Sequence, residues 1–394
     1  MKQTAASSDP RMVLFLGDDN SLVNLGTFHD LVYKHKTNEE IMLSVTWHEK
    51  FPFDHFPFDR PITFSTFVSE LQGRIVLSGF RYTFESGYLG VRLVESESEK
   101  YELDSQNGTL IGYSAELAKL KPIRFYSLPL HLPGVIITNN DEERTVGFAF
   151  EIRLEQHLER ISYLGPLRDH PHRTYLWGGD SPSDVGKRGE RAIAALLSAR
   201  VDEKGTSIEQ KIAEWMKKMG LIHSFRLRPI APNRRDYEVV IQKTPTSSEV
   251  LITDVGFGVS QILPVLVLCY YVPEGSTIIF EQPEIHLHPS VQADLADVFI
   301  DVAKNRNVQI IFESHSEYLL HRLQRRIAEE ALDNDQTALY FCSMDEEGRS
   351  HATNLEIDDY GNIANWPPDF FGDATGDLVA MTRAAMQRKM ASQP

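Results

Sequence analysis

With 394 residues, the chain is long enough to form two or more domains with a sizeable core. Its formal net charge of −16 disfavours a generally basic surface for nucleic acid, although a local basic patch remains compatible with it. Two cysteines in apolar contexts, a longest apolar stretch too short to span a membrane (Ile262–Val272) and polar residues after Met1 predict a cytoplasmic protein with no disulfide framework, membrane span or signal peptide.

The first stretch, residues 1–150, is rich in predicted β-strands. Apolar residues alternate or run together in four segments, which are Ile41–Trp47, Thr63–Leu71, Arg74–Phe84 and Tyr88–Val94. The pair Gln72-Gly73 separates the second segment from the third and predicts a turn. We therefore expect a β-rich lobe over this stretch.

The second stretch, residues 151–235, is predicted to be mostly helical, most clearly at Arg188–Val201 and Ser207–Met219. Five basic residues cluster within it: Arg168, Arg173, Lys187, Arg188 and Arg191. Such a cluster can contact the backbone of DNA or RNA, or a phosphate from a neighbouring subunit. Ordinary ion pairs on the surface of an acidic protein explain it at least as well.

The third stretch, residues 236–335, begins with a predicted hairpin, Tyr237–Gln242 and Val250–Asp254. The hairpin leads into a glycine-containing loop and a helix. We expect this stretch to carry the chemistry of the protein, because three short motifs with polar ends follow one another in it.

The first motif, Asp254–Gln261, is predicted to be a loop that leads into a helix. Gly256 and Gly258 permit tight backbone turns, and Ser260 is a suitable N-cap for a buried helix at Ile262–Tyr271. Pro264 would then fall in the first turn, where its missing N–H costs little. A loop of this kind at a helix N-terminus is a natural anion site, although by itself it is more often an ordinary turn.

The second motif is a predicted strand, Thr277–Phe280, that ends at Glu281. Its apolar and β-branched residues are typical of a parallel strand buried on both faces. In open α/β sheets, ligands bind beyond the carboxyl ends of the strands, where an acid can orient the water shell of Mg²⁺. An isolated acid at this position more often only caps the strand.

The residues after Glu281 leave the identity of a general base open. Gln282 can position a water molecule but cannot accept its proton at neutral pH. Glu284 lies two residues further on and is a candidate substitute. We therefore expect Gln282 to make this motif slow in any hydrolysis of a nucleotide phosphate.

Two histidines in the same motif allow a metal site. His286 and His288 would point the same way on an extended segment, and Glu281, Glu284 and His315 would complete the ligands. In the alternative, one histidine packs against the protein and the other forms a hydrogen bond across an interface.

The third motif is a second predicted buried strand, Val308–Phe312, followed by His315. An imidazole at a strand end can hydrogen-bond to a γ-phosphate. Ser316 is predicted to N-cap an amphipathic helix, whose apolar stripe comprises Leu319, Leu320, Leu323 and Ile327. The last stretch, residues 336–394, holds a predicted strand near Ala338–Ser343 and an aromatic tail around Trp366-Pro367.

These motifs, in this order, resemble the signature loop, the Walker B strand with its D-loop, and the switch histidine of ABC-type, SMC-like ATPases. Four other segments resemble one bacterial subfamily of predicted ATPases of the OLD-like AAA group, which ends in a small domain of unknown function: Leu22–Phe28, Tyr163–Arg168, Val185–Glu190 and the tail at Trp366-Pro367. In the resemblance, Ser260 replaces the second glycine of the signature, and Gln282 replaces the usual glutamate.

The resemblance implies an α/β fold, namely a partial P-loop NTPase of ABC type with a β-rich amino-terminal lobe and a helical insert. It implies ATP and Mg²⁺ as cofactors and a homodimer formed through the nucleotide. Glu281 would hold the metal, Glu281, Gln282, Glu284 and His315 would serve catalysis, and a second set would contact the nucleotide or lie at the dimer interface: Gly256, Gly258, Ser260, Gln261 and His288.

The printed sequence contains no GxxxxGK(S/T) phosphate loop. Phe15–Ser21 has no lysine, and in Gly179–Lys187 the spacing is too long and Arg188 replaces the serine or threonine. We expect the phosphate loop, on a strand beside that of Glu281, to be encoded upstream of Met1, with Met1–Ala6 as the tail of its helix.

Three classes of function follow. The first is an ATP-dependent dimeric switch that controls an effector protein or DNA, in genome defence or DNA repair. The second is a scaffold that does not respond to nucleotide, which the absent phosphate loop favours. The third is a metal-dependent hydrolase that uses His286, His288 and His315.

Overall fold

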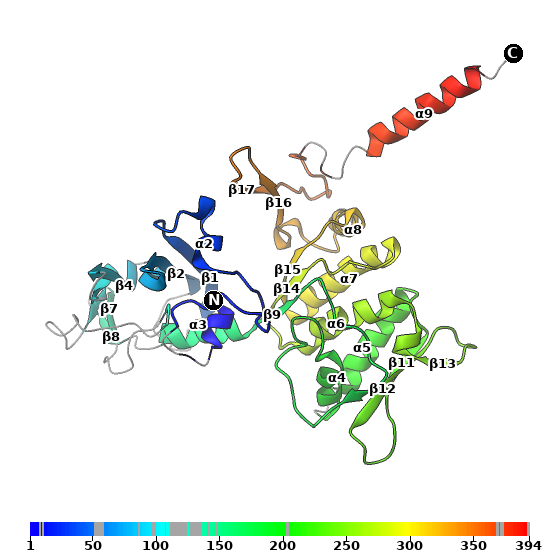
Figure 1. Ribbon diagram of the computed structural model, residues 1–394, viewed down its shortest axis with the longest axis horizontal. Helices are drawn as coiled ribbons and strands as arrows, with labels where there is room; N and C mark the ends of the chain where they lie inside the picture. The colour runs from blue at the N-terminus through cyan, green and yellow to red at the C-terminus, as the bar shows by residue number, and fades with distance from the viewer. Residues whose placement is uncertain are drawn as a thin grey trace. The chain divides into compact units, whose positions relative to one another are not determined.

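A computed structural model describes the chain over residues 1–7, 9, 12–50, 59–85, 87–95, 100–106, 108–110, 124–126, 135–139, 142–145, 149–201, 205–367, 370 and 374–391. Contacts divide the chain into two compact units, residues 1–161 and 162–394, and each is described by itself (Figure 1). The finer division of the second unit that the sequence suggested stays a prediction.

The first unit is built on an antiparallel five-stranded meander. Its strands pair in sequence order and comprise β1 (Ile41–Lys50), β2 (Asp59–Leu71), β3 (Arg74–Phe84), β4 (Gly87–Glu95) and β5 (Lys100–Gln106). Gln72 and Gly73, which join β2 to β3, both have positive φ, 51° and 76°. Such a two-residue turn matches the twist of the strands, so the predicted turn is confirmed.

Aromatic residues fill the core of this unit. Phe64 packs against Tyr82 and Phe125, with ring centroids 4.9 and 6.0 Å apart. Helix α3 (Ala149–Glu159) adds Phe150, which stacks on Tyr82 at 5.4 Å. The remaining elements are short: α1 (Lys2–Ala5), α2 (Phe28–Leu31), the 3-10 turn η1 (Tyr33–His35), β6 (Gly108–Leu110), β7 (Val135–Asn139) and β8 (Glu142–Thr145).

The second unit contains a three-stranded sheet in the order β15-β14-β9. Its strands are β9 (Ile161–Leu164), β14 (Thr277–Glu281) and β15 (Gln309–Glu313), and β14 and β15 run parallel with Glu281 opposite Glu313. Because β14 lies between β15 and β9, another strand can join this sheet only at β15 or β9. The sequence predicted that the strand of an upstream phosphate loop would lie directly beside β14. Both sides of β14 are occupied, so that placement is wrong.

The two faces of this sheet differ. Ile278 and Phe280 are fully buried on one face, and Phe280 stacks on Phe299 of α7. On the other face Ile279 is only partly buried and Ile311 is 49% exposed. The expectation of strands buried on both faces is therefore wrong for β14 and β15. Their alternating burial reflects helices packed against one side.

Helices surround the packed face (Figure 1). The almost wholly buried α6 (Phe257–Tyr271) lies against α4 (Ala192–Val201), α5 (Gly205–Lys218) and α7 (Pro289–Arg306), and α8 (Glu317–Ala328) packs along α7. The predicted stripe of α8 is confirmed, since all four of its residues are buried: Leu319, Leu320, Leu323 and Ile327.

A small antiparallel sheet and a hairpin complete the second unit. The sheet comprises β10 (Tyr175–Leu176), β11 (Ser224–Pro229), β12 (Asp236–Gln242) and β13 (Glu249–Leu251), after which Ile252–Asp254 forms the 3-10 turn η3. Beyond the 3-10 turn η4 (Asn334–Gln336), β16 (Leu339–Met344) pairs with β17 (Ser350–Leu355), and α9 (Ala374–Ala391) follows. None of the helices in the described residues is long and apolar enough to cross a membrane.

A buried acid joins α7 to α8. Asp297 accepts hydrogen bonds from Arg322 Nη1 at 2.7 Å and from Arg326 Nε and Nη2 at 2.7 and 2.8 Å. Burial alone would raise the pKa of Asp297, but the two guanidinium groups outweigh it and hold the pKa below its usual range. Asp297 therefore stabilises the fold as an anion.

Asp297→Asn should lower the free energy of unfolding at neutral pH by about 3–5 kcal/mol, because it leaves the arginines with a weaker partner. Since the native pKa lies below the unfolded value of roughly 3.9, the contribution is complete above that value and is lost as the pH falls through the native pKa. Urea unfolding at neutral and acidic pH measures both effects. Asp294→Asn, at the edge of the same cluster, should cost less; equal losses would contradict the assignment.

Candidate functional site

Two acids and a tyrosine meet at the carboxyl end of the parallel strands. Glu281 and Glu313 are in register on β14 and β15, so their side chains leave the same face of the sheet. Tyr163 of β9 lies beside them. Burial, a hydrogen bond to Glu281 and the charges of both acids raise the pKa of Tyr163 to about 12. The phenol is therefore protonated at neutral pH and donates to Glu281.

The chain turns sharply after β14. Gln282 has a positive φ of 45°, which is uncommon for a residue other than glycine. Its N–H donates to the carbonyl oxygen of Glu313 at 2.9 Å, and its side-chain Nε2 lies 3.5 Å from Glu313 Oε1. The turn therefore places the amide of Gln282 next to the carboxylate of Glu313.

Glu284 points into the protein. Its side chain is only 6% exposed, and Oε1 accepts a hydrogen bond from the backbone N–H of His315 at 2.9 Å. The second oxygen, Oε2, is buried without a hydrogen-bond partner. Glu284, the candidate substitute base, thus holds the loop of His315 in place and does not face the open side of the sheet.

Arg168 is a buried cation next to Glu284. Its Nη2 donates to the carbonyl oxygen of Gln282 at 3.3 Å, whereas Nε and Nη1 are buried without partners. Burial lowers the pKa of Arg168 to about 10, although the charge of Glu284 opposes this change, so the guanidinium stays charged at neutral pH. Arg168 therefore stabilises both the turn at Gln282 and the anion of Glu284.

His315 and Ser316 follow β15. The imidazole of His315 is 79% exposed, and its Nε2 lies 3.6 Å from Glu313 Oε1. Ser316 accepts a hydrogen bond from the N–H of Leu319 at 3.1 Å, which confirms the predicted N-cap of α8. Its hydroxyl donates to Gln292 Oε1 at 2.7 Å, and Gln292 Nε2 donates to the carbonyl oxygen of Leu287 at 3.0 Å. The loops after β14 and β15 are therefore joined through α7 as well.

Helix α6 begins earlier than the sequence predicted. Gly256 is its N-cap, and Ser260 lies inside the helix with its hydroxyl donating to the carbonyl oxygen of Phe257 at 2.8 Å. The predicted N-cap at Ser260 is therefore wrong, because this hydroxyl bonds back within the helix. Pro264 falls in the helix interior and not in the first turn; a Cβ on Gly189 would lie 2.5 Å from its Cβ, so only a glycine fits there.

The start of α6 packs on the turn after β14. Phe257 meets His286 edge to face with ring centroids 5.1 Å apart, and a Cβ on Gly258 would lie 3.5 Å from the carbonyl oxygen of His286. Gln261, one turn further along, is buried and its Nε2 has no hydrogen-bond partner. Gly256 is exposed, and a Cβ added there meets no atom within 4 Å. Of the predicted nucleotide contacts on this helix, Gly256 is thus the freely accessible one.

The two histidines after β14 do not form the predicted pair. His286 has a positive φ of 64°, which breaks the extended backbone that would align it with His288. His288 is the N-cap of α7, where its Nδ1 accepts from the N–H of Ser290 at 3.4 Å. Among the described residues, one group of three possible metal ligands has its ligand atoms within 4.8 Å of one another. That group contains neither of these histidines, nor Glu281, Glu284 or His315.

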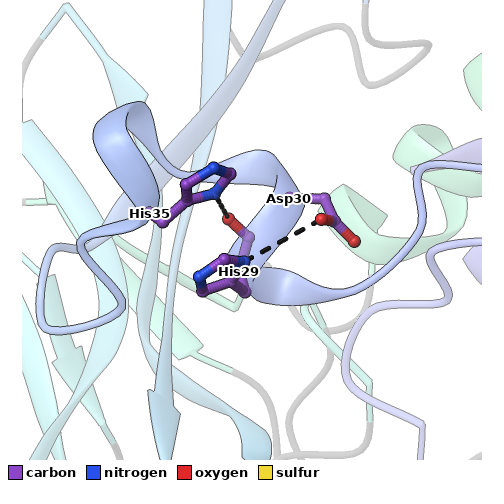
Figure 2. Close-up of side chains that lie close together, drawn as sticks. All are labelled: His29, Asp30 and His35. Carbon is purple, nitrogen blue, oxygen red and sulfur yellow. Dashed lines mark hydrogen bonds and ion pairs between the residues drawn. The ribbon is translucent and has the colours of Figure 1, made fainter.

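That group is His29, Asp30 and His35 in the first unit (Figure 2). The two imidazole rings stack with centroids 4.0 Å apart and an interplanar angle of 2°. His35 Nδ1 donates to the carbonyl oxygen of His29, and Asp30 Oδ2 accepts from the N–H of Thr27. Stacked rings direct their in-plane lone pairs alongside each other and not toward one point. The group therefore closes the turn around α2 and does not present a convergent metal site.

The arginines that suggested a phosphate surface are engaged with acids or buried. Arg173 pairs with Asp254 at 3.0 Å, Arg188 with Asp169 at 3.7 Å, and Arg191 with Asp184. The Gly-Lys turn at Gly186 is occupied by a carboxylate, because Glu190 Oε2 accepts from the N–H of Arg188 at 2.9 Å. The ion-pair interpretation of this cluster thus has direct support.

Two family matches agree with this arrangement. Residues 187–320 match the AAA ATPase domain, which agrees with an α/β fold of the P-loop NTPase kind. Residues 332–381 match a protein family of unknown function, DUF3696. The chain therefore contains a segment similar to AAA ATPase domains, followed by a segment similar to this domain of unknown function, as the motifs predicted.

Solved SMC heads are similar to the chain at low identity. The SMC head bound to the C-winged helix domain of ScpA is 12% identical over 85% of this chain and 83% of that one, with a TM-score of 0.43. The SMC head domain from Thermotoga maritima is 11% identical over 77% and 78%, with a TM-score of 0.32. An SMC ATPase studied for ATP-driven dimerization and DNA-stimulated activation is 18% identical over 41% and 89%, with a TM-score of 0.32. No curated protein matches the chain significantly.

Sequence reasoning assigned no role to Tyr163 or Glu313, and it placed Arg168 only in a basic cluster on the surface. Tyr163 lies in a segment that was noted only for its resemblance, and the burial of a cation such as Arg168 leaves no local sequence signal. Glu313 had a usable signal, because an acid at the end of each of two neighbouring parallel strands must share an edge with the other.

The pairing of Arg168 with Glu284 can be tested by a double-mutant cycle. Arg168→Met should lower stability by about 1–3 kcal/mol, because it leaves Glu284 as a buried anion without a cation. Combination with Glu284→Gln should cost less than the sum of the two single changes. Urea unfolding measures the energies, and amide hydrogen exchange at His315 should accelerate in Arg168→Met. Arg173→Met, in an exposed ion pair, is the control; additive losses at Arg168 and Glu284 would contradict the coupling.

Proposed function

We propose that the chain is the head of an ATP-dependent dimeric switch. The carboxylate of Glu281 at the carboxyl end of β14 is an oxygen ligand of the kind that Mg²⁺ prefers, so it fits a metal bound with nucleotide phosphates. Glu281 would orient the metal's water shell, with Tyr163 holding its carboxylate. The imidazole of His315 is 79% exposed beside Glu313, so a γ-phosphate could reach it from the solvent side.

The observation that carries this proposal is the hydrogen bond from the N–H of His315 to Glu284. Together with the bond from Gln282 N–H to Glu313, it fixes the acids of one loop relative to the histidine of the next. A site that must distinguish ATP from ADP needs its metal-binding acid and its phosphate-contacting group at a constant separation. These bonds supply that constraint.

A second subunit would approach at the start of α6. The first N–H groups of a helix are unpaired and attract anions, and here Gly256 opens the helix on an exposed surface. In a two-fold dimer this end of α6 would face the phosphate held by the partner, and His288 would lie near the same interface. Closure and opening would then control an effector protein or DNA in genome defence or DNA repair.

A scaffold that does not respond to nucleotide is the second candidate. The printed sequence has no GxxxxGK(S/T) segment, and its one Gly-Lys turn is occupied by Glu190. Binding of Mg²⁺-ATP to the purified full chain separates the two candidates, since the scaffold should show none.

Gly256→Arg should weaken Mg²⁺-ATP-dependent dimerisation at least about tenfold, which is about 1.4 kcal/mol, because a long cation would stand between the subunits. The backbone of Gly256 has a φ of −59°, which any residue adopts, so folding should be unaffected. Sedimentation velocity with and without Mg²⁺-ATP measures the effect. Gly256→Ala is the matched control and should dimerise normally.

Ser260 is unsuitable for this test, because arginine at its buried position would disrupt the helix packing. Wild-type protein that binds Mg²⁺-ATP but sediments as a monomer at high concentration would contradict the dimeric switch. A dimer that forms equally well in Gly256→Arg would contradict the proposed interface.

A further inference from the structure

We propose that Glu313 is the general base that accepts a proton from the attacking water; this inference rests on the proposed ATPase function. Glu313 ends β15 in register with Glu281 and is 56% exposed on the open face of the sheet. It stands beside Gln282, the residue in the position where ABC-type ATPases usually carry their glutamate. The carboxylate that Gln282 lacks is thus present on the neighbouring strand.

Two groups orient this carboxylate. Gln282 Nε2 lies 3.5 Å from Glu313 Oε1, and His315 Nε2 lies 3.6 Å from the same oxygen. Both contacts come from loops that are fixed by backbone hydrogen bonds, at Gln282 and at His315 respectively. A base must be held at a constant place relative to the atom it serves, and this arrangement provides that.

The other acids at this edge are committed elsewhere. Glu284 is buried and accepts the N–H of His315, so it has no path to a water on the open face. Glu281 accepts a hydrogen bond from Tyr163 and is the expected metal-binding acid. Gln282 is an amide and cannot take a proton at neutral pH. Glu313 is therefore the carboxylate at this edge that is both accessible and uncommitted to another role.

The step balances as a hydrolysis. Glu313 takes one proton from water while the water oxygen forms a bond to the γ-phosphorus of ATP. The bond between that phosphorus and the bridging oxygen breaks, and its electron pair leaves with ADP. The proton on Glu313 then passes to inorganic phosphate or solvent. The amide of Gln282 positions the water and the carboxylate.

The test compares four forms of the full chain: wild type, Glu313→Gln, the exchange Gln282→Glu with Glu313→Gln, and Glu317→Gln. Glu317 is an exposed acid in the first turn of α8, so its variant controls for loss of one negative charge. Each form is assayed for Mg²⁺-ATP hydrolysis, for the dissociation constant of Mg²⁺-ATP, and for the ratio of ATP to ADP that remains bound after incubation. Far-ultraviolet circular dichroism checks folding.

Glu313→Gln should reduce turnover by a factor on the order of 10²–10⁴, as expected for loss of a general base. Its dissociation constant should stay within about threefold of wild type, and its bound nucleotide should remain ATP. The exchange variant should regain about tenfold or more over Glu313→Gln, because the carboxylate returns one strand away. Glu317→Gln should behave as wild type.

Failure of this inference is distinct from failure of the proposed function. Wild type that binds no Mg²⁺-ATP overturns both. Wild type that binds and hydrolyses ATP, with Glu313→Gln equally active, overturns only the assignment of Glu313. Binding without hydrolysis in wild type also overturns it, as does a Glu313→Gln variant whose main defect is weak binding, since Glu313 would then be a metal ligand.

Discussion

The second unit depends on one buried carboxylate. Glu284 accepts the N–H of His315 at 2.9 Å, and the charged Arg168 lies next to it. A buried anion is costly unless it has partners. The backbone arrangement that brings the N–H of His315 and the guanidinium of Arg168 to Glu284 is therefore favoured. Because Arg168 also donates to the carbonyl oxygen of Gln282, the turn after β14, the loop after β15 and the segment after β9 form one connected structure.

One face of the three-stranded sheet packs against helices, and the other carries the acids of the candidate site. Ile278 and Phe280 bind the strands to the helices, and this packing fixes where each strand ends. Glu281 and Glu313 occur at alternate positions on the other face, where the partly exposed Ile279 and Ile311 also lie. Because side chains alternate between the two faces of a strand, the residues that pack in the core lie on one face and the candidate site residues lie on the other. The same packing presents the exposed end of α6 at Gly256.

Local signals in the sequence predicted much of this fold. The cap at Ser316 and the stripe ending at Ile327 follow from a hydroxyl before an apolar period, which needs no tertiary information. The turn at Gln72 follows equally from its glycine neighbour. Ser260 was predicted as a cap for the same reason and was wrong, because packing of Phe257 on His286 starts the helix one turn earlier.

The site was harder to predict because its constraints act between segments. The inward direction of Glu284 depends on a loop thirty-one residues away, and the burial of Arg168 depends on a turn more than a hundred residues away. The sequence around Gln282 showed that a carboxylate is absent from this position. The register of β14 with β15 was needed to show that the carboxylate of Glu313 lies beside it. The motifs could therefore be identified from the sequence. The roles of single residues could not, because they depend on contacts between residues far apart in the sequence.

The central claim is that this sheet edge holds a metal together with nucleotide phosphates. Titration of a fluorescent ATP analogue into wild type and Glu281→Gln, each with and without Mg²⁺, tests it most directly. The account predicts saturable binding to wild type that tightens with Mg²⁺, and loss of that Mg²⁺ dependence in Glu281→Gln. Equal Mg²⁺ dependence in the two proteins, or no binding to wild type, would contradict it.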